Sequence, residues 1–132
     1  QYAGGKLTDR VPVEYGIAGA FGTLAALAVL FVPVSGMGVA PLLALGALLG
    51  VALFVVQPLY QATVAEYTPA GTRGLSYGFT YLGVFGVGAL GGGIAGTILQ
   101  YGSVAALFVT LAGFAGAASL VGLALARKRP VE

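Results

Sequence analysis

Residues 15–65 read YGIAGAFGTLAALAVLFVPVSGMGVAPLLALGALLGVALFVVQPLYQATVA, without one charged side chain. The run is too long for a single membrane crossing, which takes about 20 apolar residues, and it has the right length for two crossings. A second run without charge covers residues 74–126 and has a similar length. The sequence therefore predicts an all-α membrane protein with four transmembrane helices.

The charged side chains gather at the start of the chain, at its middle turn and at its end. They are Lys6, Asp9, Arg10, Glu14, Glu66, Arg73, Arg127, Lys128, Arg129 and Glu132. If the chain crosses the membrane four times, all three places face the same side, and the two opposite loops carry no charge. Because Lys and Arg mark cytoplasmic loops, we predict an integral membrane protein with both termini in the cytoplasm, in a prokaryotic plasma membrane.

The composition excludes several classes of protein. Only 8% of the residues are charged, whereas an average soluble domain has about 25%. The chain has no Cys and no His, which removes disulfides, Ser-His-Asp catalysis and the usual metal sites. The net charge of +2 lies at the predicted membrane edges and forms no nucleic-acid-binding face. We therefore expect no enzyme activity, no catalytic residue, no cofactor or metal, and no nucleic acid partner; the expected surroundings are lipid.

Turn residues and charges set the predicted boundaries. Residues 1–12 are interpreted as the end of a preceding span and a cytoplasmic loop. The predicted spans are 13–33, 39–65, 74–99 and 103–126, with cytoplasmic segments at 66–73 and 127–132. Pro58 lies inside the second span and removes one helical hydrogen bond, so a kink is expected there. Because the chain begins with Gln1 and its single Met is Met37, we interpret it as a piece of a longer protein.

Glycine makes up 23 of the 132 residues, more than twice the usual share of about 7%. Small residues let transmembrane helices approach closely, so glycines four residues apart are predicted to pack against neighbouring helices. They are Gly46, Gly50, Gly74, Gly78, Gly88, Gly92 and Gly96. In a continuous α-helix, Tyr77 and Tyr81 lie on the same face as the last three of these glycines. This face is interpreted either as plain helix packing or as a contact that slides during transport.

Two motifs carry a resemblance to a known family. GKLTDR at residues 5–10 fits Gly-x-x-x-Asp-Arg, and it resembles the loop signature of the major facilitator superfamily of secondary transporters. PAGTRG at residues 69–74, followed by Tyr77 and Gly78, is similar to the turn between the tenth and eleventh spans of that family. In the family, Gly and two basic residues follow the first motif, but here residues 11–13 read VPV, which favours the more degenerate second copy.

The resemblance covers essentially the whole chain and implies a position within the family fold. It places the chain in the C-terminal half, from the end of the eighth span through the twelfth, so that the four helices are part of a six-helix half. The third to sixth spans would give the same outline. The second predicted span lacks the Arg that first-half copies often carry, and the chain ends in a basic cluster, so we favour the second half.

The resemblance also implies a function and a set of gating residues. It predicts part of a carrier that moves a small solute by alternating access, with efflux as one direction, and with the missing N-terminal half as partner. The motif is expected to hold the cytoplasmic side closed in the outward-facing state. The gating candidates are Gly5, Asp9, Arg10, Glu66 and Arg73. The alternative is a self-contained four-span scaffold or small channel that is rich in Gly.

Four polar residues are the candidates for lining a solute cavity. Gln57 and Gln61 lie one helical turn apart beside Pro58, and Tyr77 and Tyr81 share a face of the next span. A glutamine in lipid costs free energy unless it is hydrogen-bonded, so this face should meet protein or a wet cavity. Contact with solute and hydrogen bonding between helices both remain open. With few charges in the spans, a neutral or amphipathic solute is expected.

Overall fold

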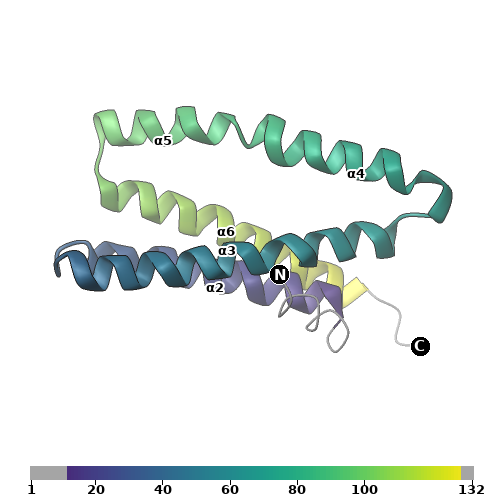
Figure 1. The fold of residues 1–132 in the computed structure, drawn as a ribbon, viewed down its shortest axis with the longest axis horizontal. Coiled ribbons are helices and arrows are strands. Elements are labelled where there is room, and N and C mark those ends of the chain that lie inside the picture. The colour runs from purple at the N-terminus through teal and green to yellow at the C-terminus, as the bar shows by residue number, and fades with distance from the viewer. Residues whose placement is uncertain (1–11, 129–132) are drawn as a thin grey trace.

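The computed structural model describes residues 12–128, which form helices joined by short turns (Figure 1). The elements are α2 (Val13–Val34), α3 (Val39–Tyr67), the 3₁₀ turn η1 (Ala70–Thr72), α4 (Arg73–Tyr81), the π-helical segment η2 (Leu82–Val87), α5 (Leu90–Tyr101) and α6 (Val104–Lys128). Four stretches are long and apolar enough to cross a membrane: Val13–Val34, Val39–Tyr67, Arg73–Tyr101 and Val104–Lys128. Within the described range there is no strand, and the prediction of an all-α fold with four spanning helices is confirmed.

The turns alternate between the two ends of the molecule. The start of α2, the connection between α3 and α4, and the end of α6 lie toward one end, while the α2–α3 and α5–α6 turns lie at the other (Figure 1). Gly38 enters α3 with a φ of 102°, a left-handed conformation that favours glycine. The described charged residues lie near the end that holds the start of α2, the α3–α4 connection and the end of α6. The α2–α3 and α5–α6 turns at the opposite end carry no charge.

Helices α2, α3 and α6 form the packed part of the structure, with α2 in contact with both others (Figure 1). Among the described residues, the buried apolar side chains come from α2 and α3: Val13, Ala18, Leu24, Ala28, Phe31, Leu45, Val56 and Leu59. At the charged end Leu59 is fully buried, and a Cβ added to Gly16 would lie 2.9 Å from its Cδ2 atom. The α2–α3 contact is therefore tight at this end.

The contact between α2 and α6 depends on small residues. A Cβ added to Gly122 would lie 3.0 Å from the backbone nitrogen of Ala18, and the Ser119 hydroxyl donates a hydrogen bond of 2.7 Å to the Ala18 carbonyl. Further along, the rings of Phe31 and Phe108 stack with their centroids 4.3 Å apart. Close backbone approach at one end and an aromatic pair toward the other fix this helix pair.

The third span stands away from this bundle (Figure 1). None of residues 73–101 is buried, and large side chains such as Leu75, Phe79 and Phe85 are about two-thirds exposed. Its α4 part contacts α3, and its α5 part contacts α6. Most of the rest of its apolar surface is exposed.

The third span, Arg73–Tyr101, is long and apolar enough to cross a membrane, but it is not α-helical throughout. Between α4 and α5 the backbone widens into η2, and the Gly88 N–H donates to the carbonyl of Gly83, five residues back, at 3.3 Å. It then tightens, because the Gly91 N–H donates to Gly88, three residues back, at 2.9 Å. Since α-helical spacing does not carry across these turns, it no longer places Tyr77 and Tyr81 on one face with Gly88, Gly92 and Gly96.

The glycines that make close contacts are different from those expected. A Cβ added to Gly46, Gly50, Gly74, Gly78, Gly92 or Gly96 would have nothing within 4 Å. At Gly88 it would meet only carbonyl and amide atoms of residues 84 and 85, in its own span. The helix-packing contacts occur instead at Gly16, Gly22 and Gly122. Within residues 12–128 the predicted positions meet no other helix, and their packing role stays a prediction, because a spacing of four marks a possible face without telling which face has a neighbour.

Candidate functional site

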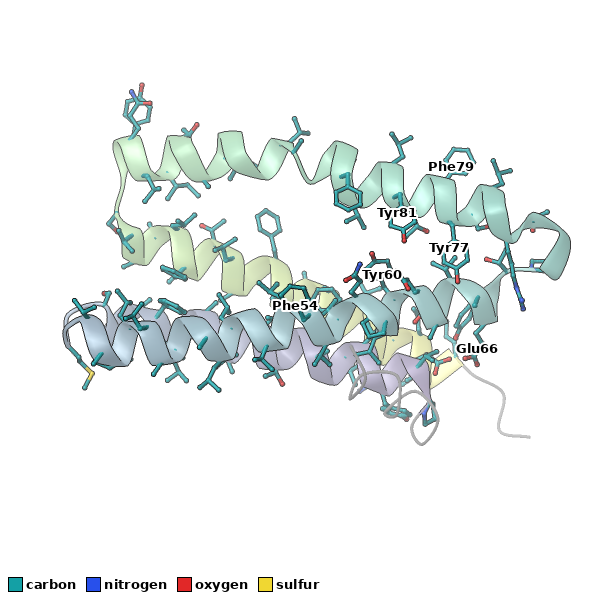
Figure 2. All side chains as sticks on the ribbon, in the orientation of Figure 1. Phe54, Tyr60, Glu66, Tyr77, Phe79 and Tyr81 are labelled. Atoms are coloured by element: carbon teal, nitrogen blue, oxygen red, sulfur yellow. The ribbon has the colours of Figure 1, made fainter. Side chains whose placement is uncertain are left out.

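A polar contact joins α3 to α4 near the charged end of the molecule. The Gln61 side-chain amide donates through Nε2 to the Tyr81 hydroxyl at 3.2 Å, and the Tyr77 hydroxyl donates to the Gln61 backbone carbonyl at 3.0 Å. Figure 2 shows Tyr77 and Tyr81 pointing from α4 toward α3, and Tyr60 pointing from α3 toward α4. Three of the four predicted cavity residues, Gln61, Tyr77 and Tyr81, thus come together.

The local sequence explains this meeting. Tyr77 and Tyr81 are four residues apart on α4 and therefore project from one face. Gln57 and Gln61 have the same spacing on α3, which runs unbroken through Pro58. Gln57 is half-buried, and it lies one turn further from the α3–α4 connection than Gln61.

Aromatic rings lie on α3, α4 and η2 near the polar contact. The Tyr81 ring stacks on Phe85 with centroids 5.9 Å apart and planes 15° from parallel. Phe54 and Tyr60 extend from α3 on the side of α4, whereas Phe79 points away from α3 (Figure 2). The site thus offers amide and hydroxyl groups beside aromatic faces, and its side chains carry no net charge. Such a set suits a solute that both donates and accepts hydrogen bonds and has an apolar body.

Glu14 is a residue whose importance the sequence did not reveal. The sequence places it only among the charges at the start of the chain. In the structure only 1% of its surface is exposed, and its Oε1 accepts a hydrogen bond of 2.5 Å from the Tyr67 hydroxyl. The contact joins the first turn of α2 to the last residue of α3. The sequence feature that could have indicated its burial is its position: Glu14 lies inside a predicted helix, two residues before Gly16, and not in the loop.

The structure describes only two of the five gating candidates. Gly5, Asp9 and Arg10 lie outside the described residues. Glu66 lies in the last turn of α3, where Figure 2 labels it, and Arg73 begins α4. The two residues flank the connection, and both are exposed. Their joint role in gating stays a prediction.

Apolar cavities occur elsewhere in the bundle. One of about 310 Å³ lies between residues 20–27 of α2 and 48–55 of α3, and one of about 250 Å³ lies where α2, α3 and α6 meet. The single hydroxyl in the wall of the first, Thr23 Oγ1, donates to the carbonyl of Gly19 in its own helix. Because these cavities offer so little polar chemistry, the α3–α4 contact is the better candidate for solute recognition.

Within residues 12–128, no three His, Cys, Asp or Glu side chains lie close enough together to hold a metal ion.

Comparison with known proteins gives one match. The family model described as Major Facilitator Superfamily matches residues 1–132, which is the whole chain. Searches of curated proteins and of solved structures returned no match.

Proposed function

The chain belongs to the major facilitator superfamily, a family of transporters, and on that premise we propose that it is part of a secondary active transporter that moves a small neutral or amphipathic solute by alternating access. The four apolar helices and the family make it an integral membrane protein. We place it in the C-terminal half of the transporter, with an N-terminal half as partner and with cytoplasmic termini in a prokaryotic plasma membrane. Efflux is the proposed direction. Family membership disfavours the self-contained scaffold or channel.

The observation that carries the solute class is the contact among Gln61, Tyr77 and Tyr81. The Gln61–Tyr81 bond is exposed, and it links two neutral groups that each have further hydrogen-bonding capacity. A solute with one donor and one acceptor can replace this bond at little net cost in free energy. Its acceptor takes the Gln61 amide hydrogen and its donor bonds to the Tyr81 oxygen, so neither side chain is left without a partner. The neighbouring rings of Tyr81 and Phe85 would then cover its apolar part.

The test is solute affinity in the intact transporter reconstituted in liposomes. Uptake of a panel of neutral amphipathic compounds identifies a transported probe, and Gln61→Leu, Gln57→Leu and Tyr81→Phe are then compared with the unchanged protein. Losing one or two hydrogen bonds should raise KM about tenfold, since about 1.4 kcal/mol corresponds to that factor. Tyr101→Phe is the matched control, because Tyr101 is 81% exposed and ends α5, far from the contact along the span. Unaltered affinity in all three variants would reduce the contact to bonding between helices.

Gating is tested separately through the motif at residues 5–10. A carboxylate at the positive end of a helix gains about 0.3–1 kcal/mol, which Asp9→Asn removes. Because this gain is proposed to favour the closed cytoplasmic side, the variant should transport more slowly at equal expression. Lys128→Gln serves as control, since Lys128 at the end of α6 is interpreted as a topology-setting charge. Unchanged transport in Asp9→Asn would remove the gating role.

A further inference from the structure

Residues 82–89 interrupt the third span with two different irregular turns. The Gly88 N–H reaches back five residues to Gly83 at 3.3 Å, and the Ala89 N–H reaches back four to Phe85 at 3.2 Å. The next two bonds span only three residues: the N–H groups of Gly91 and Gly92 donate to the carbonyls of residues 88 and 89. A π-helical stretch inside an α-helix is rare and is frequently found at functional sites.

Gly88 is the residue on which this backbone depends. A Cβ at this position would lie 2.0 Å from the carbonyl oxygen of Val84, which is a backbone atom and has no freedom to rotate away. A Cβ at Gly91, three residues further along in α5, would meet nothing within 4 Å beyond the backbone of its own helix. The interruption therefore requires glycine at position 88 and tolerates a side chain at position 91.

The two parts of the span are held by different helices. On one side α4 is bonded to α3 through Tyr77, Tyr81 and Gln61. On the other side α5 continues into α6 through a short turn, where the Gly102 N–H donates to Ile98 at 2.8 Å and the Ser103 hydroxyl accepts from the Ala106 N–H at 3.1 Å. All of residues 82–89 are exposed, and the stacking of Phe85 on Tyr81 joins the segment only to the neighbouring α4 of the same span.

We propose that residues 82–89 are a hinge that lets α4 move relative to α3 while α5 stays with α6, and that the hydrogen bonds of Gln61 with Tyr77 and Tyr81 lock it. A hinge needs a few residues that absorb backbone change, and a lock needs contacts weak enough to open and close. The irregular turns provide the first, and two neutral hydrogen bonds between exposed or half-buried groups provide the second. This goes beyond the transport proposal, because it concerns motion within one span and needs no solute.

The experiment measures two distances between spin labels in the intact protein in lipid nanodiscs. Residues 1–132 contain no Cys, so spin labels are attached to cysteines introduced at exposed positions. One pair, Leu53→Cys with Phe79→Cys, reports on α3 and α4; the other, Leu99→Cys with Val109→Cys, reports on α5 and α6. Replacing Tyr77 and Tyr81 together by Phe removes the lock and keeps both rings. The first distance should then shift or broaden by about 1–2 Å, as helix shifts do, while the second stays unchanged. If both distances change together, or neither changes, the proposal is wrong.

Gly88→Ala and Gly91→Ala then test the hinge itself, in the background with both tyrosines replaced. A methyl group at position 88 is incompatible with the widened turn, so α4 should no longer move alone, and the first distance should return toward its locked value. Gly91→Ala should leave the movement intact. Equal behaviour of the two alanine variants would overturn the assignment of the hinge to residue 88. If Gly88→Ala does not fold, the tyrosine variants alone still decide between independent and joint motion.

Discussion

Glu14 shows how a single side chain ties two helices together at the charged end. An ionised carboxylate in a buried position is unfavourable unless hydrogen bonds or opposite charges compensate it. The Tyr67 hydroxyl supplies one such bond, and the position of Glu14 in the first turn of α2 adds the favourable end of the helix dipole. Beside it, Leu59 fills the space left by the missing side chain of Gly16. Together these four residues join the start of α2 to the last turns of α3.

Replacing Tyr67 by Phe tests this contact. The change keeps the ring but removes the donor to Glu14, so the free energy of unfolding should fall by about 1 kcal/mol, the size of one polar contact in a membrane protein. The measurement is thermal unfolding in detergent or nanodiscs at fixed pH. Tyr101→Phe is the matched control, because its ring is largely exposed. An equal loss of stability in both variants would show that the Tyr67 hydroxyl contributes nothing specific.

At the scale of helices, the pair α2–α6 is the best-packed contact of the described chain. Ala18 receives both the close approach of Gly122 and the hydrogen bond from Ser119, and the stacked rings of Phe31 and Phe108 follow further along. Between helices in lipid there is no hydrophobic driving force, so close contact and dispersion hold the pair. The third span has no comparable contact with the bundle.

Gly122→Ala tests the close approach. Its methyl group would lie 3.0–3.1 Å from three atoms of Ala18, two of them backbone atoms, so the helices must separate slightly. Overpacking of this kind typically lowers stability by about 1–3 kcal/mol. Gly116→Ala on the same helix is the control: nothing lies within 4 Å, and alanine favours helix by about 1 kcal/mol relative to glycine. Thermal unfolding should therefore move in opposite directions for the two variants, and a shared direction would contradict the packing account.

For the whole molecule, the arrangement of charges makes a prediction about the membrane. Single cysteines at Gly36, in the α2–α3 turn, and at Gly71, in the α3–α4 connection, should react with a membrane-impermeant maleimide from opposite sides. Gly36 is expected to be labelled from outside intact cells, and Gly71 only after the membrane is opened. Ser103→Cys, in the other uncharged turn, should behave like position 36. Labelling of positions 36 and 71 from the same side would remove the four-span topology.

The sequence predicted those features that depend on length and on charge. Two long uncharged runs and three charged places were sufficient for four spanning helices, because lipid leaves the backbone few alternatives. The meeting of Gln61 with Tyr81 was anticipated in part, since a polar face in lipid must find a partner. The remainder depends on which helix faces which. Among the described residues, Gly46 and Gly50 have the spacing of packing glycines but meet no other helix, whereas Gly16 and Gly122 lack that spacing and do meet one. The wide turn at residues 82–87 leaves no period in the sequence that would reveal it.

The tight pairing of α2 with α6 also sets an order for how the protein is made. Ser119 bonds to Ala18 across 101 residues of chain, so the first described span must wait in the membrane until the last one leaves the ribosome. At about 5–20 residues per second this delay is roughly 5–20 seconds, during which lipid or the insertion machinery covers the small-residue face of α2. Nascent chains that stop before Val104 never receive that partner. We expect such chains to leave the small-residue face of α2 without its partner helix and to be targets for quality-control proteases.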